Sequence, residues 1–180
     1  MVPVQGMIDA VLAFVRDNRD WAFWIALVFA FGENLAFLSI VIPSTAILLG
    51  VGALVATGQL SLLPIFAGAS IGALFGSVVS YAIGWRYGQA ILSLWPLRDH
   101  PDLVEKVNAA FRRWGAYAVT IGHFFGPLRA TVPLMAGVFE MPQWLFQLAN
   151  WSSAFLWAAV LLAPGAFGGD LWKVVTGWFF

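Results

Sequence analysis

Charge is scarce in this chain of 180 residues: Asp, Glu, Lys and Arg make up 10% of it, while 61% is hydrophobic. A soluble domain carries roughly 25% charged residues. Two long stretches, 34–85 and 141–169, contain no Asp, Glu, Lys or Arg. The sequence therefore predicts an integral membrane protein forming a single domain over 1–180. Its net charge of zero excludes a basic surface for nucleic acid.

Cysteine is absent, which excludes disulfides, thiolate metal sites and cysteine nucleophiles. The two histidines, His100 and His123, lie too far apart in the sequence to suggest a metal site. The chain also lacks the cluster of Lys, Arg and His that a lipid phosphatase uses, and it lacks an Asp-rich metal motif. We therefore expect no cofactor, no bound metal and no enzymatic reaction.

Two apolar stretches are continuous enough to cross a bilayer, which takes about 20 residues in a helix. The first is predicted as a transmembrane helix over 65–85; it follows Pro64 and ends at an aromatic and basic cluster typical of a membrane interface. The second is predicted over 144–163 and stops before Pro164. A C-terminal helix is expected over 166–180.

Two polar segments are predicted to lie at the membrane surface. Residues 1–20 mix apolar and charged residues and lack the positive start and cleavage site of a signal peptide, so they predict a short amphipathic helix, with a solvated leader as the alternative. Residues 98–114 have acids early and bases late, as a capped surface helix does. The Lys and Arg residues of this second segment place it in the cytoplasm.

Two other segments, 33–57 and 115–142, are interrupted by glycine and proline and share a spacing. In the first, an acid precedes Pro43 by ten residues, and in the second, a histidine precedes Pro133 by ten. Paired, interrupted apolar segments in two halves of a chain indicate a transporter site between structural repeats. A coincidence of spacing is the alternative.

The second broken segment contains one arginine, Arg129, within residues 123–137, a run that is apolar apart from this arginine and a histidine. Its helix breakers include Gly126, Pro127, Pro133 and Gly137. Charge buried in a membrane is costly and usually functional, and irregular backbone at membrane depth needs protein or water around it. Because a guanidinium binds phosphate or carboxylate through two parallel hydrogen bonds, Arg129 predicts an anion site. An internal salt bridge with Glu33 is the alternative.

Further positions are candidates for the same site. Glu33 is the only acid in 21–85 and could bind and release a proton if desolvated; a hydrated interfacial carboxylate is the alternative. Ser44 and Thr45 begin a helical stretch whose first N–H groups suit a phosphate, or Ser44 simply caps it. His123 is either a titratable donor to the site or a packed side chain.

The end of the first span reads Tyr-x-x-Gly-x-Arg-x-Gly, from Tyr81 to Gly88. Its glycines allow helices to approach closely. Arg86 is expected to extend to the cytoplasmic headgroups, and a secondary role at the substrate, shared with Tyr81, is the alternative. The ten tryptophans are interpreted as interface anchors rather than a binding cage.

Three motifs in this order resemble the DedA family, which is the VTT or SNARE-associated-domain superfamily and includes eukaryotic lipid scramblases. They are Glu33 followed by Pro43-Ser44, the pattern of glycine, tyrosine and arginine over 76–88, and residues 124–137. The resemblance covers residues 25–165. It implies two oppositely oriented re-entrant helical hairpins among transmembrane helices, and a role in moving lipids across the membrane.

The same resemblance implies roles for individual residues. It makes Glu33 the acid of the first hairpin and Arg129 the arginine of the second. Bacterial members of the family are linked to recycling of undecaprenyl phosphate, the lipid carrier of cell-wall precursors, and to physiology that depends on the proton motive force.

Three departures from the family pattern matter for the site. Ser44-Thr45 stands where an acid is usual, His123 where an arginine is usual, and Gly76-Ser77 where Gly-Asp is frequent. If His123 replaces arginine only while protonated, activity should fall as pH rises.

Together these observations predict an all-α membrane protein of the bacterial cytoplasmic membrane, with transmembrane helices, two re-entrant hairpins and short amphipathic interfacial helices. We expect it to translocate polyprenyl phosphate, with protons as the candidate coupling ion. The phosphate is expected between Arg129 and the helix start at Ser44, while Glu33 alternates between Arg129 and a proton. The alternatives are a nonspecific phospholipid scramblase, a proton-coupled ion or small-solute transporter, and a scaffold. Glycine-rich helices also permit a homo-oligomer.

Overall fold

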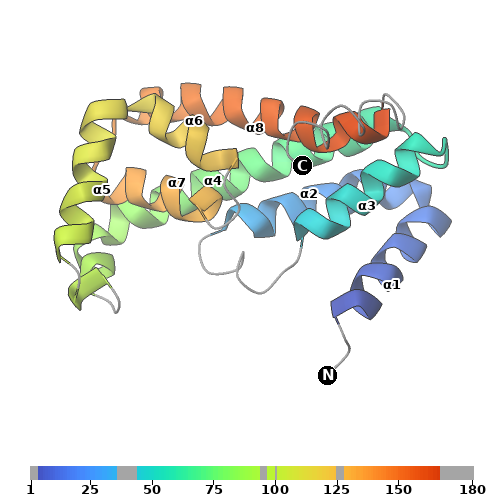
Figure 1. Ribbon diagram of the computed structural model, residues 1–180, viewed down its shortest axis with the longest axis horizontal. Coiled ribbons are helices and arrows are strands. Elements are labelled where there is room, and N and C mark those ends of the chain that lie inside the picture. The colour runs from blue at the N-terminus through green and yellow to red at the C-terminus, as the bar shows by residue number, and fades with distance from the viewer. Residues whose placement is uncertain (1–3, 36–43, 94–96, 100, 125–127, 167–180) are drawn as a thin grey trace, which may run out of the picture.

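The described parts of the chain consist of helices joined by short turns. The computed structural model describes residues 4–35, 44–93, 97–99, 101–124 and 128–166, and these ranges contain no strand (Figure 1). The helices are α1 Val4–Asp17, α2 Ala22–Asn34, α3 Ser44–Ala56, α4 Leu62–Leu92, α5 Pro101–Trp114, α6 Ala116–Phe124, α7 Leu128–Val138 and α8 Gln143–Ala166, with short 3-10 turns at Arg19–Trp21 and Leu97–Asp99. The prediction of an all-α protein is confirmed. The helix expected over 166–180 lies outside the described residues, apart from Ala166 at the end of α8.

Two of the described helices are long and apolar enough to cross a membrane. They are Leu62–Gly88 of α4 and Gln143–Leu162 of α8. The transmembrane helices predicted over 65–85 and 144–163 fall on these two elements. Tyr87 has non-helical angles, φ −119° and ψ 18°, so α4 is kinked where the aromatic and basic cluster was expected at the interface.

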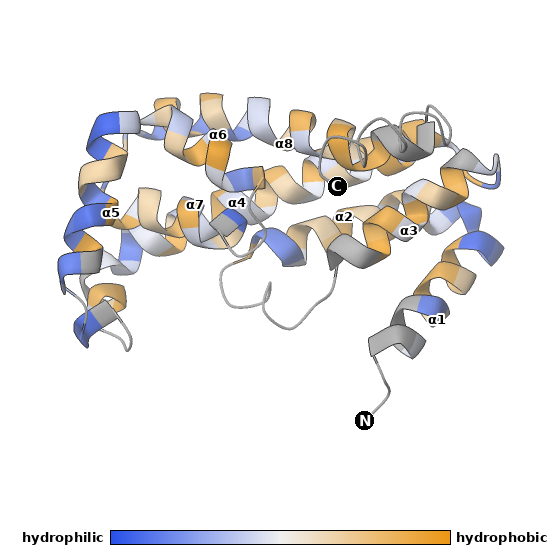
Figure 2. Ribbon diagram, in the orientation of Figure 1, coloured by the Kyte–Doolittle hydropathy of each residue, from blue (hydrophilic) through white to orange (hydrophobic). Residues whose placement is uncertain are grey.

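The two segments expected at the membrane surface also form helices. α5 has Asp102 in its first turn and Arg112 and Arg113 in its last, so its charged ends complement the helix dipole. Gly115 follows with φ +51°, the left-handed conformation that commonly ends a helix. Figure 2 shows hydrophilic residues gathered on α5 and on parts of α1, whereas α2, α3 and α8 are mostly hydrophobic.

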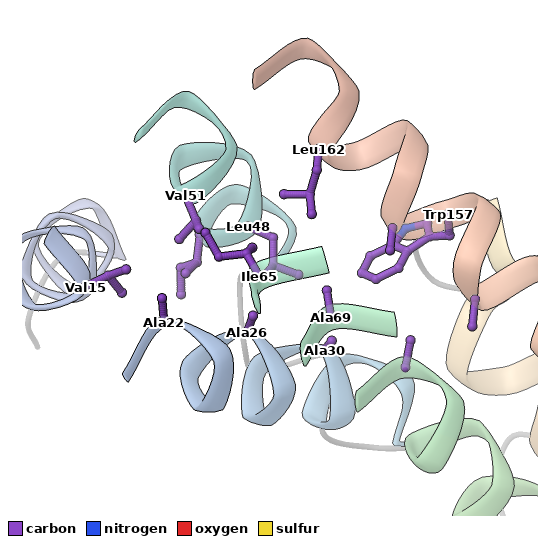
Figure 3. Packing of buried hydrophobic residues seen from close by; sticks show 14 of the residues in the cluster. Val15, Ala22, Ala26, Ala30, Leu48, Val51, Ile65, Ala69, Trp157 and Leu162 are labelled. Carbon is purple, nitrogen blue, oxygen red and sulfur yellow. The ribbon is translucent and has the colours of Figure 1, made fainter. Parts of the chain in front are cut away.

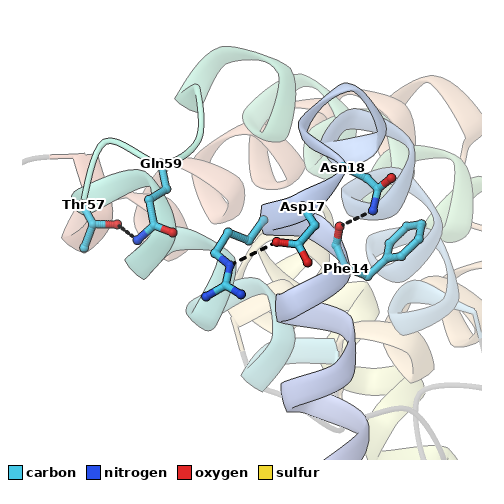
Figure 4. Close-up of polar contacts among 6 residues, drawn as sticks. Phe14, Asp17, Asn18, Thr57 and Gln59 are labelled. Carbon is cyan, nitrogen blue, oxygen red and sulfur yellow. Dashed lines mark hydrogen bonds and ion pairs between the residues drawn. The ribbon is translucent and has the colours of Figure 1, made fainter.

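Polar contacts gather where α1 ends and where α3 turns into α4 (Figure 4). The Asn18 side chain donates a hydrogen bond of 3.0 Å to the Phe14 carbonyl. The Gln59 amide donates one of 2.9 Å to the Thr57 hydroxyl. Both bonds are exposed, so this end of the molecule satisfies its polar groups at a surface rather than in the core.

A core of small and branched side chains joins α1, α2, α3, α4 and α8 (Figure 3). α2 contributes Ala22, Ala26 and Ala30, which share one face of the helix because they are four residues apart. Leu48 of α3 and Leu162 of α8 pack over this layer. The small α2 side chains allow its backbone to lie close to α4.

α4 supports α2 along its first half through backbone contact. A Cβ on Gly68, Gly72 or Gly76 would overlap the carbonyl oxygens of Phe23, Leu27 and Phe31 respectively. The residue numbers of the glycines and of the residues that they face increase in the same order, so α2 and α4 run parallel. Glycine is required at these positions for the two helices to pack so closely.

α7 packs against the second half of α4 in the same manner. A Cβ on Gly84 would overlap the Leu134 carbonyl oxygen, and a Cβ on Gly137 would overlap that of Tyr81. Gly88 faces Val138, so α7 also runs parallel to α4.

α2 and α7 therefore follow one another along a single long helix. α2 ends at Asn34, whose carbonyl accepts a hydrogen bond from Ser80 of α4. Ser77 and Ser80 lie near the middle of the 27-residue span Leu62–Gly88. The C-terminus of α2 thus meets the N-terminus of α7 halfway along α4, and two half-length helices form one interrupted column.

A second interrupted column lies along α8, which packs against α6 and α3 (Figure 1). His123, near the end of α6, has its ring 6.0 Å from that of Trp157. Gly52, in the middle of α3, faces Leu162 farther along α8. α6 and α3 thus pack along successive parts of α8, as α2 and α7 do along α4.

Each of the two broken segments is a pair of contacting helices. α2 and α3 flank residues 36–43, and α6 and α7 flank residues 125–127. The first pair begins at Ala22 rather than at residue 33, because Glu33 lies in the last turn of α2. That these pairs re-enter the membrane as hairpins stays a prediction.

The predicted equivalence of Pro43 and Pro133 is wrong. Pro133 lies inside α7 and is buried. α3 begins at Ser44, immediately after Pro43, and α7 begins at Leu128, immediately after Pro127. The proline that corresponds to Pro43 by position is therefore Pro127, and the ten-residue spacing to Pro133 is a coincidence.

Two of the predicted helix breakers do not break a helix. Pro133 removes one backbone donor from α7 without ending it, as membrane helices tolerate. Gly137 lets α7 approach the backbone of α4. The other three, Pro43, Gly126 and Pro127, lie outside the described residues.

Candidate functional site

An ion pair lies at the junction of α2 and α7. Arg129 Nη1 is 2.8 Å from Glu33 Oε1, and both residues are about as buried as core side chains, at 4% and 5% exposure. Glu33 comes from the last turn of α2 and Arg129 from the first turn of α7. The two residues singled out from the sequence are therefore in direct contact, as the salt-bridge alternative expected.

Trp157 of α8 forms one wall of this ion pair. The guanidinium carbon of Arg129 lies 5.0 Å from the centre of the Trp157 ring, within the range of a cation–π contact. Trp157 is buried, unlike the exposed Trp24, Trp85 and Trp144. The interpretation of the tryptophans as interface anchors is therefore wrong for Trp157, because this side chain faces the charged centre.

His123 joins the cluster from α6. Its side chain is 1% exposed and its ring meets Trp157 at 66°, edge to face. Neither ring nitrogen has a hydrogen-bond partner among the described residues. The Arg129 guanidinium packs on the same Trp157 ring. Four helices, α2, α6, α7 and α8, thus contribute one side chain each to a buried centre.

A group of polar residues anchors the end of α2 to α4, and sequence reasoning named only Ser77 of this group, as a departure from the family pattern. The Asn34 side chain donates to the Ala30 carbonyl at 2.8 Å and accepts from Ser77 at 3.3 Å. Ser80 donates to the Asn34 carbonyl at 2.8 Å. The signal was available in the sequence, since Asn34 adjoins Glu33 and the serines interrupt an apolar helix. These bonds hold Glu33 in position by fixing its neighbour.

The predicted phosphate cradle at the start of α3 is only partly described. α3 begins at Ser44, as expected, and Leu48, one turn later, packs in the core with Trp157. The side chains of Ser44 and Thr45 lie outside the described parts. Their contact with a phosphate stays a prediction.

The two secondary candidates have their described contacts with residues outside the cluster. The Tyr81 hydroxyl donates to the Met141 carbonyl at 2.6 Å, and its ring stacks on Phe146 at 4.3 Å. Arg86 is exposed, with its guanidinium carbon 5.4 Å from the centre of the Tyr87 ring. Tyr81 thus fastens the helices together, and Arg86 has the exposure expected of an arginine that reaches the headgroups.

Residues 68–72 read Gly-Ala-Ser-Ile-Gly, the letter pattern of a hydrolase nucleophile turn, and sequence reasoning overlooked it. That chemistry needs a serine on a sharp turn from strand to helix. Here the five residues lie within the continuous helix α4, where Ser70 is buried and two of the glycines face α2. The pattern reflects helix packing.

Comparison with known proteins assigns the chain to a family. The VTT domain matches residues 42–167, so the chain belongs to the VTT-domain (DedA) family that its motifs resemble. Inner membrane protein YabI of Escherichia coli K12 is 28% identical over 164 residues, covering 91% of this chain and 65% of YabI. Inner membrane protein YghB of the same strain is 28% identical over 172 residues, covering 92% of this chain and 78% of YghB.

An uncharacterized membrane protein of Buchnera aphidicola subsp. Baizongia pistaciae is 26% identical over 158 residues, or 88% of this chain and 62% of that protein. The chain thus spans less than two thirds of the length of YabI and of the Buchnera protein. No solved structure matches the chain. Family membership and the two long apolar helices identify an integral protein of the bacterial inner membrane.

Proposed function

We propose that this protein moves polyprenyl phosphate across the cytoplasmic membrane, with the headgroup phosphate bound to Arg129. The observation that carries the proposal is the Glu33–Arg129 pair, buried between two helix ends halfway along the 27-residue span Leu62–Gly88. In a membrane protein a buried ionisable pair marks a substrate or ion pathway by default. We take the helix pairs around it to be re-entrant hairpins whose ends meet near mid-membrane.

At both helix ends the helix dipole disfavours the charge of the side chain located there. Glu33 lies at the C-terminus of α2, the negative end of the helix dipole, and Arg129 lies at the N-terminus of α7, the positive end. Each charge is stabilised by the other rather than by its own helix. An anion beside Arg129 would instead sit at a helix N-terminus, which favours it.

This arrangement suits an exchange between two states. In the empty state Glu33 pairs with Arg129. In the loaded state Glu33 takes up a proton and releases Arg129, whose guanidinium binds the phosphate through parallel hydrogen bonds. A cycle of this kind requires each ligand to favour one state over the other, and the ion pair supplies that difference. No bond in the lipid is made or broken, so we propose a transporter and not an enzyme.

The test is lipid translocation in proteoliposomes that contain undecaprenyl phosphate, with phosphatidylglycerol as a parallel substrate. Wild type is compared with Arg129→Lys, Glu33→Gln and the exposed control Arg112→Lys. Arg129→Lys keeps the charge but loses the paired donors, so we expect polyprenyl-phosphate movement to fall by about tenfold or more. Arg112→Lys should move lipid at the wild-type rate.

Three results would redirect the proposal. Equal movement of both lipids by wild type indicates a nonspecific scramblase. Movement of neither lipid by well-folded protein refutes lipid transport and leaves an ion-coupled or scaffold role. Full activity of Arg129→Lys removes the assigned role of the guanidinium.

A further inference from the structure

His123 presents an unexplained feature of the buried centre. Its side chain is 1% exposed, and neither ring nitrogen has a partner among the described residues. An imidazole always has at least one N–H to donate, and burying it without a partner is unfavourable. The ring lies beside Trp157, which also receives the Arg129 guanidinium. A group that enters the centre to reach Arg129 therefore meets a hydrogen-bonding partner already in place.

The positive charge available to that group is small. In residues 22–85 and 115–169 the sequence contains one Lys or Arg, which is Arg129. The basic residues of the neighbouring helix α5, which are Lys106, Arg112 and Arg113, are exposed. The acids of the same two stretches are Glu33, in the cluster, and Glu140, which is exposed in the turn after α7. The centre thus contains one fixed cation and one carboxylate.

A second cation at His123 is unfavourable in this setting. Protonation would place two positive charges around one Trp157 ring, and the described centre has one carboxylate, Glu33, to balance them. α8 contributes no charged residue within its bounds, and α7 contributes Arg129 alone. His123 thus offers a hydrogen bond without a charge, and the centre balances a single negative charge when Glu33 is protonated.

We propose, on the basis of the function above, that the centre selects phosphate groups that carry one negative charge. Arg129 neutralises that charge, His123 supplies an uncharged hydrogen bond, and protonated Glu33 keeps the loaded centre neutral. A doubly charged phosphate or a diphosphate would leave at least one buried negative charge unbalanced, which is strongly disfavoured. A phosphate monoester is therefore carried as its singly protonated form, and diphosphates are excluded.

The test uses three single-chain amphiphiles in uncharged maltoside micelles at pH 8, with affinities measured by calorimetry. Decyl phosphate carries about two negative charges at this pH, because its second pKa is about 6. Decyl sulfate has nearly the same shape and one charge, and decyl methyl phosphate has one charge with a phosphorus centre. We expect the two singly charged probes to bind at least about tenfold more tightly than decyl phosphate.

Two variants at one position separate charge from hydrogen bonding. His123→Arg adds a second cation, so it should abolish or reverse the preference. His123→Gln keeps an uncharged donor and should retain it. Arg112→Gln, which removes an exposed charge on α5, is the matched control and should also retain it. Because the wild-type comparison of probes needs no variant, poor folding of His123→Arg does not leave the question open.

The outcomes distinguish this inference from the function on which it rests. Equal binding of singly and doubly charged probes by wild type overturns charge selection, and so does an unchanged preference in well-folded His123→Arg. If such a result accompanies lipid transport that Arg129→Lys abolishes, the transport function stands without charge selection. If wild type binds none of the probes and moves no lipid, both proposals fail together.

Discussion

α4 and α8 are both long enough to cross a membrane, yet they hold their neighbours in different ways. α4 has glycines at 68, 72, 76, 84 and 88, so α2 and α7 lie against its backbone. α8 has no glycine before Gly165 and meets its neighbours through side chains, both large ones such as Phe146 and Trp157 and small ones such as Ala154 and Ala158. Backbone contact leaves little freedom, whereas side chains can change rotamer.

The difference assigns distinct roles to the two sides of the buried centre. Glu33 and Arg129 lie on helices that are held by α4, so their meeting point is set by a rigid scaffold. His123 and Trp157 lie on the α6 and α8 side, where packing depends on side chains. We therefore expect any opening for the substrate to involve movement of α6 and α8 rather than of α2 and α7.

The largest effect is expected from filling the closest backbone contact. A Cβ at Gly84 already overlaps the Leu134 carbonyl, so Gly84→Leu should prevent α7 from docking. Overpacking forces side chains off their rotamers and shifts the backbone, and here the overlapping atom is itself a backbone oxygen, so α7 as a whole would have to move. The fraction of monodisperse protein in detergent measures this. Ala159→Leu, at an exposed position on α8, is the control, and equal yields of both variants would refute backbone packing at α4.

The next effect is expected from breaking the buried ion pair. Removing one partner of such a pair costs about 3–5 kcal/mol, because an uncompensated charge remains. Arg129→Gln should therefore lower the thermal midpoint markedly, while Arg129→Gln combined with Glu33→Gln should recover much of the loss. The double-mutant cycle measures this coupling. Additive effects of the two changes would contradict a direct pair.

A smaller effect is expected at the α8 wall of the centre. Trp157→Phe keeps an aromatic ring but weakens the contact with Arg129, which is worth about 0.5–2 kcal/mol. The exposed Trp151 provides a matched control, since Trp151→Phe should leave stability unchanged. Thermal unfolding of both variants makes the comparison. A larger loss of thermal stability in Trp151→Phe than in Trp157→Phe would contradict a stabilising contact between Trp157 and Arg129.

The smallest effect is expected from one hydrogen bond at the α2–α4 junction. Ser80→Ala removes the bond to the Asn34 carbonyl, and such bonds between membrane helices average about 0.6 kcal/mol. Ser152, exposed on α8 and bonded within its own helix, is the control. We expect a shift in the thermal midpoint for Ser80→Ala that exceeds the shift for Ser152→Ala. A reversed order would show that the junction does not depend on this bond.

Much of the helical architecture could be read from local patterns. The apolar runs that became α4 and α8 are long enough to cross a bilayer core, and the charge order of 98–114 matches the capped helix α5. The sequence pattern misled where the same spacing of residues occurs in two different structures. Pro43 and Pro133 have equal spacing from a polar residue, yet Pro133 lies inside α7, because a proline alone does not end a membrane helix.

The residues of the candidate site also fall into two groups, those that the sequence indicated and those that it did not. Glu33, His123 and Arg129 stand out in the sequence because each is an isolated ionisable residue in an apolar stretch. Trp157 did not stand out, since it is one of ten tryptophans and only its burial separates it from the interface anchors. Asn34, Ser77 and Ser80 interrupt apolar stretches of the sequence, but the hydrogen bonds that join them form only when α2 lies against α4.

The sequence by itself determined that this chain is a helical membrane protein with one buried cation, because hydrophobicity and charge are properties of residues and short segments. The tertiary structure alone decided that Glu33 and Arg129 form a pair and that His123 and Trp157 complete the centre. Those contacts join helices far apart in the chain. They exist because the glycines of α4 let two half-length helices lie end to end, and no local pattern records where such ends meet.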